Sequence, residues 1–388
     1  MSVRRIGLGT SLAATMAAAT FAPAVFSVLA VPLRSEFSVA RWRIGVLVTV
    51  VMAVGALLSP ISGTWADRLE PRTSNALTLV LAGISFIAMG LSPGYWPLAG
   101  AASIAGLAQA MCNPATNRLI MSHAGVGRRG FLTGLKQAGV QAGNFLGGIF
   151  LPIGAASALG WRGTVSLVTA MPLLGLVALG VAAGKREAPV ESPPRSPLTK
   201  SPPEVIRLAV YGALLGLAAG SLFTYLPSYA QEGFGMSTEV GGLLVSVFGA
   251  VGFITRLAAG HVSERYFGHQ RTLVAMALLT SLAGVLMATA PNGGWLWPAA
   301  VLIGIGPMAW NVVANVAVME LAPEGAAGRG SGVMMAGFFG GMAAGAPAYG
   351  ASVDLVGSYR PGWLGVVILG VAAAWVAAGV RPRELSPH

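Results

Sequence analysis

The chain has 388 residues and a formal net charge of +11; 55% of its residues are apolar, only 10% are charged, and its mean hydropathy is +0.72. A charged fraction this small cannot cover the surface of a water-soluble domain of this length. Lipid must therefore cover most of the protein. Because the basic residues lie in short clusters between apolar runs, the net charge does not predict nucleic-acid binding.

Cysteine and histidine are too scarce for most metal and redox chemistry. The single cysteine, Cys112, excludes an internal disulfide and a cysteine-based metal site, and the four histidines lack the spacing of metal ligands. A Gly-x-x-x-x-Gly-Lys-Ser/Thr loop for ATP is also missing from the sequence. We therefore expect no cofactor and no metal.

The apolar runs predict twelve membrane spans, because a bilayer core of about 30 Å needs about 20 apolar residues per helix. The first run follows Arg4 and Arg5, as in a signal peptide, but it exceeds the usual length and many spans follow, so we expect a retained helix. The twelve predicted spans are 7–31, 44–65, 74–92, 97–121, 131–155, 163–183, 206–230, 239–261, 272–290, 296–320, 331–353 and 362–380.

A polar, proline-rich segment, 185–205, separates the sixth span from the seventh. It cannot bury a core, so it predicts a cytoplasmic linker between an N-terminal six-helix bundle, 1–184, and a C-terminal one, 206–388. Placing the linker and both termini in the cytoplasm puts sixteen Lys and Arg residues on that side and five outside. This asymmetry follows the positive-inside rule and predicts a multi-pass protein of the inner, cytoplasmic membrane.

The two halves repeat each other at nearly equal offsets. Three pairs of motifs recur: Gly63-Thr-Trp-Ala-Asp67-Arg68 with Gly260-His-Val-Ser-Glu264-Arg265 after 197 positions, Asn113 and Asn117 with Asn311 and Asn315 after 198, and Arg129-Gly130 with Arg329-Gly330 after 200. The agreement of the three offsets indicates a duplicated six-helix unit. The predicted fold class is an all-α membrane protein with twelve transmembrane helices in two pseudo-symmetric six-helix bundles.

This architecture, with the loop Gly63-x-x-x-Asp67-Arg68-x-x-x-Arg72 after the second span, resembles the major facilitator superfamily of secondary transporters. The sequence departs from the family pattern at Leu69-Glu70-Pro71, where a glycine usually follows the first basic residue. The resemblance implies transport by alternating access. It also implies a gating role for the loop and its repeat, that is, for Gly63, Asp67, Arg68, Arg72, Glu264 and Arg265.

Three basic residues fall inside predicted spans: Arg118, Lys136 and Arg256. A cation in hydrocarbon costs at least about 2.5–3.5 kcal/mol, so such residues normally face a cavity or a partner. All thirteen carboxylates lie in loops or near span ends, so an anionic substrate is the predicted counter-ion. The alternative is that each long side chain extends to the headgroups from a shallow position.

Neutral hydrogen-bonding side chains accompany these cations at helical spacing. They are Gln137, Gln141 and Asn144 in 131–155, Asn113 and Asn117 in 97–121, Asn311 and Asn315 in 296–320, and Tyr225 and Tyr229 in 206–230. Positions three or four apart share one helix face, so each set forms a polar stripe. Such stripes either line a pathway for a substrate or bind helices to each other.

The setting of Arg256 resembles that of monocarboxylate, oxalate/formate and related organic-anion carriers, although Gly252 stands where some of them have an aspartate. The segment around Lys136 is similar to cyanate and nitroimidazole permeases. Drug/proton antiporters commonly have an arginine near Ala105 or Gly106, which is missing here.

We therefore expect a secondary active transporter of a small, monocarboxylate-like organic anion, with a drug or multidrug efflux antiporter as the alternative. A proton is the candidate coupling ion, and the lipid bilayer is the expected surroundings of a monomer. An enzyme would need clustered catalytic groups at membrane depth, which the sequence lacks.

The predicted orientation can be tested by proteolysis. Protease added to sealed right-side-out vesicles should leave the 185–205 linker intact, and it should cut the linker once the vesicles are opened. Cleavage in sealed vesicles would contradict the cytoplasmic placement of the linker.

Overall fold

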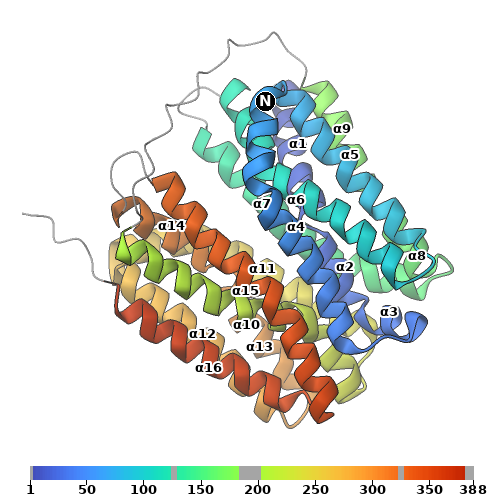
Figure 1. The fold of residues 1–388 in the computed structure, drawn as a ribbon, viewed down its shortest axis with the longest axis vertical. Coiled ribbons are helices and arrows are strands. Elements are labelled where there is room, and N and C mark those ends of the chain that lie inside the picture. The colour runs from blue at the N-terminus through green and yellow to red at the C-terminus, as the bar shows by residue number, and fades with distance from the viewer. Residues whose placement is uncertain (1–2, 124–128, 183–201, 322–326, 381–388) are drawn as a thin grey trace, which may run out of the picture. The chain divides into compact units, whose positions relative to one another are not determined.

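The computed structural model describes residues 3–123, 129–182, 202–321 and 327–380, which form helices and no strand. Figure 1 shows these helices. Their bounds are α1 Val3–Ala19, α2 Ala22–Val28, α3 Ala30–Phe37, α4 Arg41–Arg68, α5 Pro71–Gly90, α6 Tyr95–His123, α7 Arg129–Ala156, α8 Gly160–Leu167, α9 Ala170–Val181, α10 Pro203–Phe234, α11 Thr238–Val262, η2 Ser263–Phe267, α12 His269–Thr289, η3 Gly293–Trp295, α13 Leu296–Ile305, α14 Trp310–Leu321, α15 Ala327–Val356 and α16 Arg360–Ala378.

Each of the twelve predicted spans corresponds to one helix or to one interrupted pair of helices. Among the described residues, eight spans are long and apolar enough to cross a membrane, and the bent pair formed by α1 and α2 would make a ninth. The other predicted spans coincide with α6, α7 and α15. The fold is thus the predicted all-α membrane fold of two pseudo-symmetric bundles.

Three predicted spans are broken where the sequence analysis expected one continuous helix. The first bends by 50° between α1 and α2, where Pro23 lies in the first turn of α2. The tenth breaks between α13 and α14, at Gly306-Pro307, and the sixth between α8 and α9. Proline has no backbone N–H to continue a helix, which explains the break before Pro23 in the first span and the break at Pro307 in the tenth. The short helix α3, Ala30–Phe37, was not predicted.

The helices group into two compact units. The first contains residues 1–39 and 47–193, and the second contains 40–46 and 194–388. By this grouping the start of α4 belongs with the second unit. Most of the predicted linker, residues 183–201, lies outside the described residues, so its role stays a prediction.

Glycine allows the same close helix contact in both units. A Cβ atom on Gly139 of α7 would overlap the Ala13 carbonyl oxygen of α1, and one on Gly337 of α15 would overlap that of Ala209 in α10. Gly337 lies 198 positions after Gly139, and Ala209 lies 196 after Ala13. Close backbone approach through small residues stabilises helix pairs in lipid, where the hydrophobic effect does not hold helices together.

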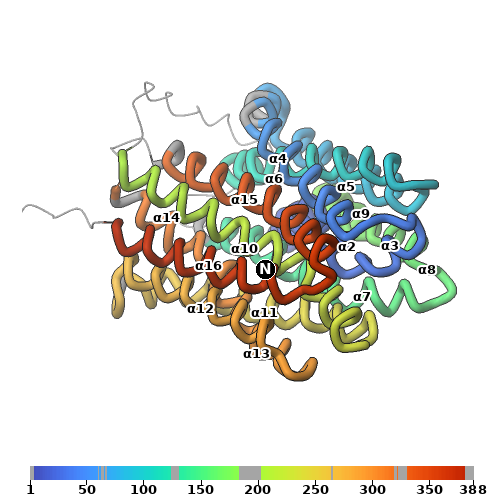
Figure 2. The backbone as a smooth tube through the Cα atoms, turned by 60° about the horizontal axis from the view of Figure 1, so that its bottom comes forward, coloured from blue at the N-terminus to red at the C-terminus, as the bar shows by residue number. Residues whose placement is uncertain are grey.

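Within the second unit, α10 packs along α15, and α12 packs along α16. The second pair lies side by side in both Figure 1 and Figure 2. Tyr211 of α10 donates a hydrogen bond of 2.8 Å to the Leu273 carbonyl of α12, in a core that also contains Trp310 and Met334. Such bonds fix the rotation of each helix about its axis.

Neighbouring glycines of α15 give a matched test of this packing. A Cβ atom on Gly341 would overlap the Ala213 carbonyl oxygen, whereas one on Gly340 would meet no atom within 4 Å. Gly341→Ala should therefore destabilise the protein by about 1–3 kcal/mol through overpacking. Gly340→Ala should leave its stability unchanged or raise it, because alanine favours helix. Thermal unfolding in detergent measures both, and equal stability of the two variants would contradict the close contact of α10 with α15.

Candidate functional site

Lys136 of α7 is the most enclosed cation among the predicted site residues. Its side chain is 2% exposed. The ammonium group donates to three oxygens of α6: Asn117 Oδ1 at 2.5 Å, Asn113 Oδ1 at 3.2 Å and Thr116 Oγ1 at 3.2 Å. An ammonium group has three donors, so α6 satisfies all of them. The structure thus brings together Lys136 and the amide pair Asn113 and Asn117, and it adds Thr116, which sequence analysis missed.

The local shape of α6 presents these oxygens on one face. Asn113, Thr116 and Asn117 lie three or four positions apart, so they share a side of the helix. Pro114 lies inside the same turn and cannot donate to the Ala110 carbonyl. The hydroxyl of Ser62 on α4 donates to that carbonyl at 2.8 Å instead. The helix therefore continues through the proline with its freed carbonyl satisfied.

Charge around Lys136 is not neutralised by the described side chains. Every oxygen that its ammonium contacts is neutral, and no described carboxylate forms an ion pair with it. Asn113 and Asn117 are themselves exposed. The positive charge therefore lies behind an exposed amide surface.

The remaining predicted residues of these two helices differ in burial. Gln137 is half-buried, Gln141 is 2% exposed, and Asn144 is 7% exposed. Arg118 of α6 is half-buried beside Asn117. The polar stripe of α7 is thus mostly enclosed by protein.

Arg256 of α11 lies at the break between α13 and α14. Its Nε donates to the Met308 carbonyl at 2.9 Å, and Met308 belongs to the turn that interrupts the span. The half-buried guanidinium therefore compensates for a backbone irregularity in addition to carrying charge at membrane depth. A backbone carbonyl in a membrane needs such a donor.

Asn311 and Asn315 follow this break on α14. The amide nitrogen of Asn315 donates to the Asn311 carbonyl at 2.7 Å. The Asn311 side-chain oxygen is buried and has no hydrogen-bond partner among the described residues. Arg256 and Asn311 thus provide polar atoms on two helices of the second unit that contact each other.

Tyr225 and Tyr229 of α10 lie in an aromatic cluster. Tyr225 stacks on Tyr349 with ring centroids 4.9 Å apart, and Tyr229 packs against Tyr359 and Trp363 at 5.1 and 5.5 Å. The Tyr225 hydroxyl donates to the Arg41 carbonyl at 2.8 Å, and that of Tyr229 to the Met287 carbonyl at 3.0 Å. Both hydroxyls therefore have structural partners.

The two tyrosines lie far from Arg256. They belong to the last turns of α10, and α11 begins after a short turn that follows it. Arg256 comes eighteen residues after Thr238, or about 27 Å along α11. The structure therefore does not group the tyrosines with this arginine.

An ion-pair cluster in the second unit was not found from the sequence. Arg41 contacts Glu232 at 2.5 Å and Asp354 at 3.2 Å, and the Tyr359 hydroxyl donates to Glu232 at 2.8 Å. Burial raises the pKa of Tyr359, and the negative charge of Glu232 raises it further. Glu232 lies 191 positions after Arg41, and Asp354 lies 122 positions after Glu232. No local sequence pattern connects residues so far apart.

The predicted gating residues are only partly described. The surroundings of Gly63 and the side chains of Asp67 and Glu264 are not among the described parts of the structure, and Arg68 and Arg265 are exposed at helix ends. Arg72 donates to the Leu179 carbonyl of α9 at 3.2 Å. Their gating role stays a prediction.

Comparison with known proteins agrees with this architecture. The family model described as Major Facilitator Superfamily matches residues 8–346. The uncharacterized MFS-type transporter YfnC of Bacillus subtilis is 23% identical over 379 residues, covering 93% of this chain and 90% of that protein. The fosmidomycin resistance protein of Escherichia coli is 23% identical over 219 residues, covering 53% of this chain and 52% of that protein.

Solved structures show the same fold. A bacterial homologue of the human lysosomal transporter Spinster, in an inward-facing and occupied conformation, matches with a TM-score of 0.80 at 16% identity over 97% of each chain. The nucleoside transporter NupG matches with a TM-score of 0.75 at 11% identity, over 97% of this chain and 99% of that one. Since the family model covers most of a helical chain that shares this fold, the protein belongs to the Major Facilitator Superfamily of transporters.

Proposed function

We propose that this transporter moves a small, monocarboxylate-like organic anion across the cytoplasmic membrane by secondary active transport. The observation that supports this is the uncompensated charge of Lys136, whose ammonium contacts three neutral oxygens and no described carboxylate. Neutral oxygens solvate a cation without cancelling its field. An anion near the exposed amides of Asn113 and Asn117 would lower the cost of burying that charge.

Arg256 is the second cation of the proposal. Arginine recognises a carboxylate through two parallel hydrogen bonds, and it stays charged when buried. Its bond to the Met308 carbonyl holds the side chain in one orientation, and a pre-oriented group loses less entropy on binding. The buried Asn311 oxygen on the adjacent helix, which lacks a hydrogen-bond partner among the described residues, would accept from a hydroxyl group of the substrate.

Drug efflux is the second candidate function, and one comparison favours it. The relative from Escherichia coli is named for fosmidomycin resistance, and export of a drug by this chain would fit such a likeness. A thermal-shift screen of the purified protein against carboxylates, inorganic anions and cationic drugs separates the two functions. Compounds that bind the folded state raise the apparent stability, and we expect carboxylates to do so.

Proton coupling and a monomeric state complete the proposal. No described carboxylate lies in the middle of a membrane helix, where proton-coupled carriers often use one. We therefore propose that a coupled proton would be carried by the anion itself or by a basic side chain within a membrane helix, such as Lys136. We propose that the monomer is sufficient for transport, since one chain contains both compact units.

The charge of Lys136 can be separated from its hydrogen bonds. Lys136→Gln keeps donors toward α6 and loses the charge, so it should strongly reduce anion uptake. Thr116→Val keeps the charge and removes one neutral acceptor, so it should lower stability by about 1 kcal/mol and retain most uptake. Uptake into proteoliposomes and thermal unfolding are the measurements. Full anion uptake by Lys136→Gln would contradict the proposal and leave Lys136 as a contact between α6 and α7.

The geometry of Arg256 provides a second test. Arg256→Lys keeps a positive charge and loses the paired donors, so affinity for a carboxylate should fall. Arg256→Ala should lose roughly 2–5 kcal/mol of binding free energy, as expected when one partner of a buried charge pair is removed. The control is Arg271→Lys at the exposed start of α12, which should bind normally. Equal anion affinity in the wild type and in Arg256→Ala would contradict a role of this arginine in binding.

A further inference from the structure

A groove with a volume of about 1030 Å³ runs along the first unit, where α7 and α9 lie against α1. Small residues form its floor, among them Ala13 and Ala17 of α1 and Gly143 of α7. Their side chains are too short to fill the space between the larger residues at the edges, such as Leu146 and Leu174, which are 54% and 56% exposed. The groove contains none of the residues proposed above for anion transport.

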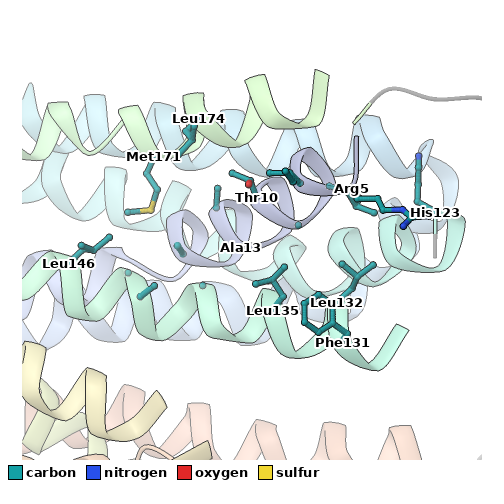
Figure 3. Close-up of a pocket in the computed structure, with 18 residues that line it drawn as sticks. Arg5, Thr10, Ala13, His123, Phe131, Leu132, Leu135, Leu146, Met171 and Leu174 are labelled. Carbon is teal, nitrogen blue, oxygen red and sulfur yellow. The ribbon is translucent and has the colours of Figure 1, made fainter. Parts of the chain in front are cut away.

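The two ends of the groove differ in polarity. Figure 3 shows Arg5 and His123 together at one end, and Leu146 and Met171 at the other. None of the described residues that line the groove is acidic. The groove therefore combines a basic end with a long apolar body.

The basic end has donors available for a ligand. The His123 Nδ1 atom lies 2.8 Å from the Ser122 hydroxyl and 3.2 Å from the Leu119 carbonyl, so neighbouring groups of α6 occupy this ring nitrogen. When the Ser122 hydroxyl donates to Nδ1, the ring carries its proton on Nε2, which has no hydrogen bond to the described residues and can donate to a ligand. Arg5 is exposed near the start of α1, and a guanidinium group binds phosphate oxygens through two parallel hydrogen bonds.

The length of the groove corresponds to one leaflet of a membrane. Arg5 and Ala17 are twelve residues apart on α1, which is about 18 Å along the helix. Half of a hydrocarbon core of about 30 Å is about 15 Å. An acyl chain whose headgroup lies at Arg5 would therefore reach to the far end of the groove near the bilayer midplane.

We propose that this groove binds one anionic phospholipid of the surrounding bilayer. Arg5 and His123 hold its phosphate, and one acyl chain lies over the floor of Ala13, Ala17 and Gly143. Basic residues beside a membrane helix attract anionic lipids, which fits the positive end, and the apolar body fits a hydrocarbon chain. A zwitterionic lipid such as phosphatidylcholine offers the same phosphate, but its choline cation would lie beside Arg5 and His123 and weaken that contact.

Native mass spectrometry of the full-length protein tests this site. The detergent-purified protein is mixed with equal amounts of phosphatidylglycerol and phosphatidylcholine, and bound lipids are counted. The wild type should retain one phosphatidylglycerol in preference to phosphatidylcholine. Arg5→Gln should weaken this retention about fivefold, the effect expected for one basic group near anionic lipid, and His123→Gln should weaken it further.

Two more variants make the result specific to the groove. Arg4→Gln removes an exposed arginine of α1 that does not line the groove, so it should retain phosphatidylglycerol as the wild type does. Ala142→Phe places a large side chain at an exposed lining position, so it should lose the lipid with both basic residues intact. Normal thermal unfolding in lipid-free detergent confirms that each variant is folded.

Three outcomes would overturn the proposal. They are equal retention of the two lipids by the wild type, equal losses in Arg4→Gln and Arg5→Gln, and full retention of phosphatidylglycerol by Ala142→Phe. Because lipid retention is counted without any transport measurement, these outcomes leave the proposed anion transport untouched.

Discussion

Inside a bilayer, every backbone N–H and carbonyl must find a partner within the protein, and this constraint shapes the structure wherever a helix is irregular. Pro114 frees the Ala110 carbonyl, which accepts from the Ser62 hydroxyl. At the break between α13 and α14, the Met308 carbonyl accepts from Arg256. One of the two candidate binding cations thus also repairs the backbone. The fold fixes the position of the Arg256 guanidinium, so any substrate that binds Arg256 must fit a group that is already held in place.

Close contacts through glycine are the second requirement, and they explain why the two halves still resemble each other. The backbone of α7 approaches that of α1 where Gly139 meets Ala13, and the backbone of α15 approaches that of α10 where Gly337 meets Ala209. A larger residue at either glycine would push the two helices apart. Surface residues facing lipid have no comparable restriction. Duplicated halves can therefore diverge widely in sequence while these crossings persist.

Hydropathy predicted the location of the twelve spans because lipid imposes nearly the same length on each apolar run. The breaks at Thr20 and Gly306 were not predicted, because hydropathy does not change across a kink. The amide stripe of α6 and Lys136 were each expected to be functional, but their direct contact depends on helix rotation. Arg41, Glu232 and Asp354 meet only in three dimensions, so no sequence pattern of period 3.6 could connect them.

The distribution of charge limits the chemistry of the substrate more than any single residue does. Described carboxylates lie at helix ends, as Glu232 and Asp354 do, where water and Arg41 stabilise them. Lys136 and Arg256 lie within helices, against neutral oxygens and a carbonyl. A cationic substrate near either of them would add repulsion to an existing desolvation cost, whereas an anion would relieve it. We therefore propose an anionic substrate on electrostatic grounds, before the shape of the binding site is considered.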